Sequence, residues 1–302
     1  MTDPSRPSRP SRSRSTPAPG RPGPPDGRRT RITRRGRLVL LATALAAVAA
    51  AIAVPFVLGG DEDEGPRHAG TLTVPEGWRA SQVYAAVDTA LHLKKGTTGK
   101  KAADAGLALP GDAGGNPEGY LYPATYPITD RTTPERLLTA MVDTANRTYA
   151  GGTVAAGAEQ NAVSRYQLVT VASIVQSEAA TDKDMARVAR VVYNRLDEGM
   201  PLQMDSTLNY GLGRSTLHTK TSETRSKTPY NTYVHKGLPP TPIANPGAQA
   251  LRAATRPAEG DWLYFVTVKH GDTRFTSDYA EHQKNVAEFN KLHSSPSASA
   301  SS

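Results

Sequence analysis

The clearest periodic pattern of apolar residues lies in the middle of the chain, just before Glu178. At the spacing of three and four residues that marks one buried face of an α-helix, it contains Leu168, Val171, Ala172, Val175 and Ala179. At about 100° per residue, Glu178 falls about 20° from Val171 on this helix, so we expect its carboxylate to be partly shielded from water. Desolvation raises a carboxylic acid's pKa, and a glutamate tuned from about 4.3 towards 6 or 7 can donate and accept a proton near neutral pH.

A second amphipathic helix follows immediately. Thr181 and Asp184 form its predicted N-terminal cap, its apolar side chains recur from Met185 to Leu196, and Gly199 gives a stop signal. The two helices form a predicted hairpin that brings the extended polar segment 202–210 close to Glu178. The alternative is that Glu178 turns to solvent and pairs with a Lys or Arg, as most helical glutamates do.

The remaining pattern predicts short strands and further helices around this hairpin. Strands are expected near 71–77 and in a hairpin formed by 263–268 and 273–276, and helices at 81–93, after Pro134, and over 278–291. Residues 94–117 have no steady period and are expected to form a loop. The predicted fold class is α+β, with a mainly helical domain and short strands.

The N-terminal region carries a different signal. Residues 38–58 form a run of 21 residues without charge, which at 1.5 Å per residue is long enough to cross a bilayer core. Arginines precede this run and the acidic sequence DEDE follows it, so the N terminus is expected in the cytoplasm and the rest of the chain outside, at the cell membrane. The alternative is a cleaved signal peptide, although the apolar run is longer than is usual for one.

The charge of the chain is concentrated in the tail before this span. Residues 1–37 contain eleven Arg and two Asp, a net charge of +9, whereas the whole chain carries +8, which leaves −1 for the rest. A basic Pro/Ser/Arg-rich tail without aromatic residues is typical of a disordered segment beside an anionic membrane surface, so no specific nucleic-acid partner is expected. Residues 59–70 are predicted to be a linker, and 293–302 a disordered tail.

The composition also excludes several kinds of site. The chain has no cysteine, which rules out disulfides, a cysteine nucleophile and thiolate metal ligands. Its seven histidines are scattered without the paired spacing of a zinc site. We therefore predict no metal and no cofactor.

Several longer motifs around and beyond the hairpin carry a family resemblance. ASIVQSEA, VVYNRL, GMPLQMDST and NYGLG occur in succession, preceded by EGYLYPATY at 118–126 and followed by PYNTYVHKGLPPTPIANPG and DWLYFVT. In this order they resemble the motifs of the YceG-like (MltG) family of membrane-bound endolytic murein transglycosylases. Ala124 departs from the family, which usually has an acidic residue at that position.

The resemblance implies a division into a LysM-like module at 71–128 and a catalytic domain at 129–292. It implies a peptidoglycan lytic transglycosylase that cleaves the β-1,4 bond between N-acetylmuramic acid and N-acetylglucosamine in nascent strands, with Glu178 as the catalytic residue. Cell-wall synthesis or division proteins are further candidate partners. The candidate substrate-binding residues, which offer hydroxyl, amide and carboxylate groups near Glu178 in motif order, are Gln203, Asp205, Tyr210, Tyr230, Asn231 and Thr232.

Two other function classes stay open at this point. A glycoside hydrolase needs a second carboxylate to activate water or attack the sugar, and Asp205 is the candidate. A non-catalytic, membrane-anchored cell-wall binding or scaffold protein would not need Glu178 at all.

Overall fold

The computed structural model describes residues 68–214 and 222–293. The predicted basic tail, the membrane span at 38–58 and the C-terminal tail after residue 293 lie outside the described residues. No helix in the described ranges has both the length and the apolar character that crossing a bilayer requires.

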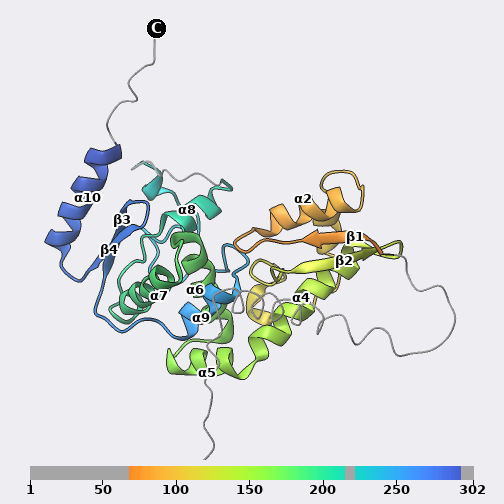
Figure 1. Cartoon of the computed structure of the whole chain (residues 1–302), viewed down its shortest axis with the longest axis horizontal. Helices are drawn as coiled ribbons and strands as arrows, with labels where there is room; N and C mark the ends of the chain where they lie inside the picture. Colours follow the sequence, from red (N-terminus) through yellow and green to blue (C-terminus); the bar gives the residue numbers. More distant parts are fainter. Residues whose placement is uncertain (1–67, 215–221, 294–302) are drawn as a thin grey trace, which may run out of the picture. The chain divides into compact units, whose positions relative to one another are not determined.

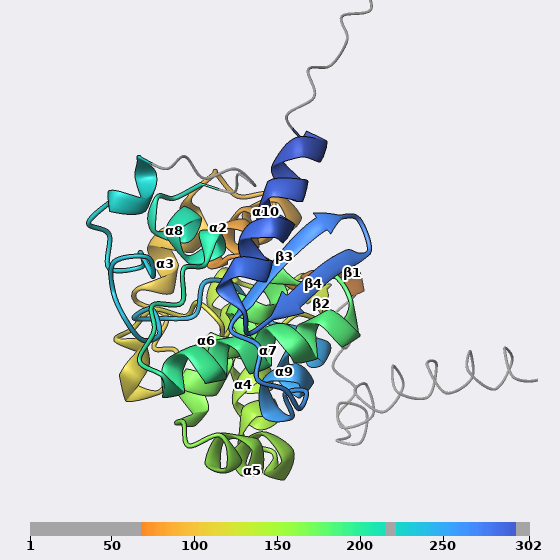
Figure 2. The same cartoon turned by 90° about the vertical axis from the view of Figure 1, so that its left-hand side faces the viewer.

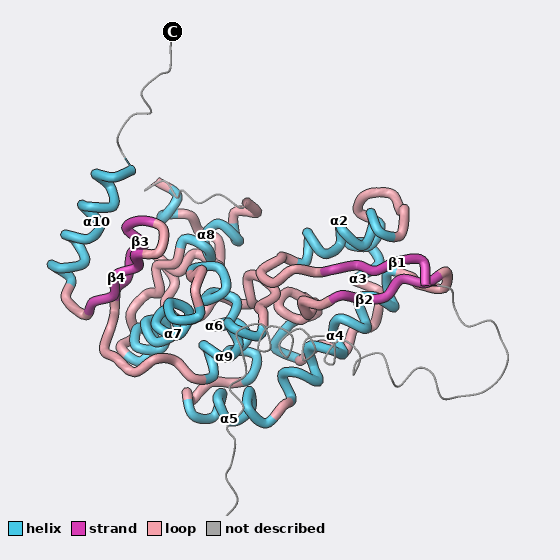
Figure 3. Tube along the Cα trace, viewed as in Figure 1, coloured by secondary structure: helices cyan, strands magenta, loops and turns pink. Residues whose placement is uncertain are grey.

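The described chain is mainly helical and holds two small sheets of two strands each (Figures 1 and 3). This agrees with the predicted mixture of helices and short strands. The strands are β1 (His68–Thr73), β2 (Thr125–Thr129), β3 (Tyr264–Lys269) and β4 (Asp272–Thr276). The helices are α2 (Ala80–Ala90), α3 (Thr97–Ala102), α4 (Pro134–Ala150), α5 (Gly152–Gln160), α6 (Arg165–Glu178), α7 (Asp182–Asp197), α8 (Asp205–Gly211), α9 (Ala248–Thr255) and α10 (Tyr279–His293), with 3-10 turns at Gly111–Ala113 and Glu223–Arg225.

The N-terminal sheet forms from segments more than fifty residues apart. β1 and β2 pair antiparallel, with Leu72 opposite Tyr126, and α2 and α3 lie between them in sequence. The residues from His68 onward therefore belong to a strand rather than to the predicted linker. The predicted loop at 94–117 contains α3, which packs against α2 and α4.

Helix α6 is the centre of the C-terminal packing. The sequence predicted one buried stripe, but eight consecutive residues, 168–175, are all buried, because α5, α7 and α9 pack around the helix. Ser164 caps its start by accepting a hydrogen bond from the Gln167 amide at 3.1 Å. A helix that is buried all round has few places for a charge, and α6 carries its one acidic residue, Glu178, at its last position.

The predicted helical hairpin is confirmed. The Thr181 hydroxyl accepts a hydrogen bond from the Asp184 amide at 3.1 Å and caps α7, which packs against α6. Gly199 has φ +62°, the left-handed conformation that stops a helix. The segment expected to be extended is only partly so, since Asp205–Gly211 forms α8.

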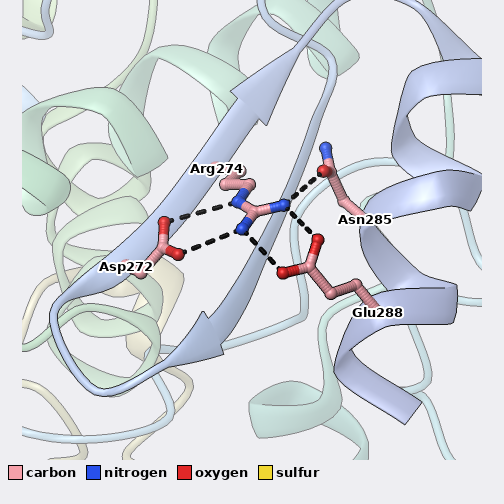
Figure 4. Close-up of polar contacts among 4 residues, drawn as sticks. All are labelled: Asp272, Arg274, Asn285 and Glu288. Atoms are coloured by element: carbon pink, nitrogen blue, oxygen red, sulfur yellow. Dashed lines mark hydrogen bonds and ion pairs between the residues drawn. The ribbon is translucent and has the colours of Figure 1, made fainter. Parts of the chain in front are cut away.

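The C-terminal strands and helix also agree with the prediction. β3 and β4 pair antiparallel with Phe265 opposite Phe275, and α10 packs along β3, as the turned view shows (Figure 2). Arg274 on β4 links the β3–β4 hairpin to α10, because its guanidinium donates hydrogen bonds to Glu288 at 2.7 Å and to Asn285 at 3.1 Å (Figure 4). It also forms an ion pair with Asp272.

Candidate active site

Glu178 lies where the central helix meets the start of a second, short helix. Its Oε1 accepts a hydrogen bond from the Ser206 amide at 3.3 Å, and Ser206 is in the first turn of α8. Burial raises the pKa of the Glu178 carboxyl above its usual range, hydrogen bonding by Ser206 works against this rise, and the nearby charge of Asp205 adds to it. The arrangement suits a group that is protonated before a reaction and takes a proton back afterwards.

Asp205 is held by a tyrosine from a distant loop. The Tyr233 hydroxyl donates to Asp205 Oδ1 at 2.7 Å. Burial and this bond to Asp205 both raise the pKa of Tyr233, so the phenol stays protonated and keeps donating. The structure therefore brings Asp205 close to Glu178 and fixes its orientation.

Gln203 is exposed at the same edge and has an unusual backbone, with φ +54°. Arg195, which is only 6% exposed, holds this segment: its Nη1 donates to Leu202 O at 2.6 Å and to Gln203 Oε1 at 3.3 Å. Its Nε donates to Leu263 O at 2.6 Å, so one guanidinium ties α7, the segment before α8 and the start of the β3–β4 hairpin together. Among the predicted binding residues, Gln203 is exposed and Asp205 is partly exposed, and the charge of Asp205 acts on Glu178.

Asn231 and Thr232 lie beside the site but point into the protein. Asn231 is 0% exposed, and its amide donates to Thr224 O and Ser226 O. The Thr232 hydroxyl accepts from the Met204 amide at 3.0 Å. In this arrangement both side chains support the loop and the segment before α8, so a direct role in sugar binding stays a prediction.

Tyr210 on α8 and Tyr230 form an aromatic pair, with ring centroids 4.8 Å apart. The Tyr230 hydroxyl is within 2.9 Å of Thr241 Oγ1, and the Tyr210 hydroxyl donates to Glu118 Oε2 at 3.1 Å. Glu118 is only 2% exposed, and burial raises its pKa to about 7. In the sequence, Glu118 is marked only as the first residue of the motif EGYLYPATY. Its contact with Tyr210 was not predicted.

One cavity in the described part of the chain lies apart from the residues around Glu178. It has a volume of about 710 Å³ and is lined by residues near the start of α6, such as Ser164 and Tyr166, and by Leu238 to Pro240. In the described ranges no group of three or more His, Cys, Asp or Glu side chains gathers in a way that could hold a metal ion.

Comparisons with known proteins show the family of this chain. The chain is 40% identical over 168 residues to an endolytic murein transglycosylase of Bacillus subtilis (strain 168), an alignment that covers 55% of this chain and 46% of the relative. It is 31% identical over 260 residues to an endolytic murein transglycosylase of Streptococcus pneumoniae serotype 2 (strain D39), which covers 76% of this chain and 46% of that relative. The chain thus spans about half the length of these relatives.

A crystal structure of a yceG-like protein from Listeria monocytogenes has a similar fold. The TM-score is 0.65 at 30% sequence identity, and the match covers 72% of this chain and 75% of the other. The model of the YceG-like family matches residues 50–288, which include both of the small sheets, the helical hairpin and Glu178. The chain belongs to the YceG-like family.

Proposed function

We propose that this protein is an endolytic murein transglycosylase that cuts peptidoglycan glycan strands with Glu178 as its catalytic residue. The observation that carries the proposal is the setting of Glu178, a partly buried carboxyl with a raised pKa at the end of the buried helix α6, beside Ser206 and Asp205. The names of the B. subtilis and S. pneumoniae relatives support the substrate and the reaction class.

In the proposed reaction Glu178 acts twice. Protonated at the start, it donates its proton to the glycosidic oxygen as the β-1,4 bond between N-acetylmuramic acid and N-acetylglucosamine breaks. As a carboxylate it then takes the proton of the muramic acid C6 hydroxyl, whose oxygen bonds to C1 and leaves a 1,6-anhydro end. The attacking hydroxyl is already part of the substrate, so one carboxyl is sufficient and no water or protein nucleophile is consumed.

Asp205 supports a second candidate, a glycoside hydrolase. It lies close enough to Glu178 to raise that group's pKa through its charge, and Tyr233 fixes it. In a retaining or inverting hydrolase the second carboxylate attacks the sugar or activates water. In the transglycosylase Asp205 would instead keep Glu178 protonated in the resting enzyme and orient the glycan.

The proposal also makes this protein a membrane-anchored enzyme, with the anchor in the N-terminal part of the chain. Residues 38–58 would span the cell membrane once, with the N terminus in the cytoplasm and the domains that follow outside, where nascent glycan is made. Residues 71–128 would form a LysM-like module, which the β1–α2–α3–β2 order and the antiparallel pairing of its strands support. Termination of glycan elongation beside synthesis or division proteins would follow from this placement.

Digestion of purified glycan strands by the full-length protein tests the proposal. Glu178→Gln keeps the size of the side chain but cannot transfer the proton, so cleavage should fall by orders of magnitude. Glu198→Gln, the same change at an exposed position, should cleave like the wild type. Mass spectrometry of the products distinguishes the two reactions, because anhydro ends are lighter than reducing ends by one water.

Reducing ends from the wild type would replace the transglycosylase with the hydrolase, and Asp205→Asn would then be expected to remove activity as fully as Glu178→Gln. Full activity of Glu178→Gln would refute the assignment of the catalytic residue. No cleavage by the wild type would leave the non-catalytic binding protein as the function to test.

A further inference from the structure

A buried polar cluster joins the N-terminal part of the described chain to the loop that follows the candidate site. Glu118 and Asn245 are 2% and 0% exposed. Both oxygens of Glu118 lie near the Ala80 amide, at 2.9 and 3.2 Å, and the Asn245 side chain donates to Glu118 Oε1 at 3.3 Å. Asn245 also donates to Trp78 O at 2.8 Å and accepts from the Leu121 amide at 2.8 Å. The carboxylate of Glu118 is therefore held in place by groups from distant segments.

Tyr210 extends this cluster to α8. Its hydroxyl donates to Glu118 Oε2 at 3.1 Å, and the guanidinium of Arg79 lies over its ring, 5.0 Å from the centroid. Tyr210 follows Ser206 by four residues on the helix, so the two side chains lie on the same side of α8, one turn apart. The Ser206 amide is the group that donates to Glu178. Helix α8 thus contacts Glu178 through a backbone amide at its start and Glu118 through the Tyr210 side chain near its end.

We propose that Glu118 is a positioning residue for the Glu178 site, which it serves by holding the hydroxyl of Tyr210. This inference rests on the proposed function. Glu118 is too deeply buried to touch a glycan, and its oxygens are occupied by donors from the protein. Above about pH 7, where Glu118 is ionised, the Tyr210 hydroxyl donates to a fixed carboxylate. Such a bond is stronger than one between neutral groups, and it restricts the Tyr210 ring to one orientation. A glycan that contacts this ring then binds to a surface that is already ordered. Less conformational entropy is lost on binding and in the reaction.

A double-mutant cycle in the full-length protein tests the link. Glu118→Gln, Tyr210→Phe and the double variant are compared with the wild type by kcat/KM on purified glycan strands, at a temperature where all four are folded. Tyr210→Phe keeps the ring and removes only the hydroxyl, so it is a mild change. We expect each single change to lower kcat/KM about tenfold, and the double variant to lower it no further, because both changes break the same contact.

Tyr149→Phe is the matched control. Its hydroxyl is also buried and donates to the backbone carbonyl of Gly119, the residue next to Glu118, at 2.8 Å, rather than to the Glu118 carboxyl. This variant should lower the melting temperature and leave kcat/KM within about twofold of the wild type. A purely structural role of Glu118 would give the same result as this control.

Two results would overturn the positioning role while the proposed function stands. In the first, the wild type cleaves glycan, and the factors by which the two single changes lower kcat/KM multiply in the double variant. The second is a Tyr210→Phe variant with unchanged kcat/KM. A wild type that does not cleave glycan overturns the proposed function, and the inference with it, so the wild-type reaction separates the two failures.

Discussion

Glu118→Gln should change how the stability of this protein depends on pH. Burial raises the pKa of Glu118 from its ordinary value of 4.5 to about 7, although the Ala80 amide, the Tyr210 hydroxyl and the charge of Arg79 all favour the carboxylate. The folded protein therefore holds a proton on Glu118 at pH values where the unfolded chain has released it. Glutamine resembles the protonated acid in shape and cannot ionise, so the variant lacks this dependence.

The expected size follows from the two pKa values. Between pH 4.5 and about 7 the folded state binds one more proton at Glu118 than the unfolded state, so the wild type loses stability as the pH rises, by about 1.4 kcal/mol per pH unit. The whole loss is about 3 kcal/mol, is complete just above pH 7, and is absent below pH 4.5. The free energy of unfolding of Glu118→Gln minus that of the wild type should rise by this amount across the window and then level off.

Urea unfolding of both full-length proteins from pH 5 to 9 measures this difference. The lost contacts to Tyr210 and Asn245 shift the difference in the free energy of unfolding by the same amount at every pH. The contributions of other titrating groups such as Glu178 cancel, because both proteins contain these groups. Glu135→Gln is the control. Lys101 lowers the pKa of Glu135 to about 2, so its stabilising effect is lost only as the pH falls below 4.5, and its difference curve should be flat from pH 5 to 9. A flat curve for Glu118→Gln would refute the account of a desolvated carboxyl at this position.

Two further predictions concern residues around the site. Gly119→Ala should destabilise the protein by about 2 to 5 kcal/mol in urea unfolding, because Gly119 has φ +84° and an added Cβ would lie 2.6 Å from the rigid ring of Pro242; a loss below 1 kcal/mol would contradict this reading of the contact. Asn231→Ala should cost about 1 to 3 kcal/mol of stability, since it removes the buried amide that bonds two loop carbonyls, whereas Gln203→Ala at the exposed edge should leave stability nearly unchanged and weaken glycan binding. Equal stability of these last two variants would show that Asn231 does not support the loop.

The sequence predicted those elements whose signals are local. Thr133 and Pro134 mark the start of α4, and Thr181 marks that of α7, because a side-chain cap and a fixed proline φ act on neighbouring residues alone. The hairpin of β3 and β4 and the helix after it were equally clear. Helix α8 was missed because it is short and polar at its start, and its preceding segment is positioned by contacts from Arg195 and Thr232, which come from other parts of the chain.

The functional residues divide in the same way. Helical periodicity and motif order predicted Glu178 and Asp205 as site residues, but whether a polar residue faces a ligand or the protein depends on what packs against it. Asn231 and Thr232 were predicted beside Glu178 and are buried supports of the loop. Glu118 lies 60 residues before Glu178 in the chain, and no local pattern connects it to Tyr210.

By itself the sequence determined the helical hairpin and the placement of one acid at the end of an apolar helix, because each depends on residues that are neighbours in the chain. The order of its motifs also indicated the family. The tertiary structure alone decided that α6 is buried on all sides, that Tyr233 holds Asp205, and that Glu118 holds Tyr210. Desolvation and hydrogen bonding depend on tertiary contacts between residues that are distant in the sequence, and sequence spacing does not specify those contacts.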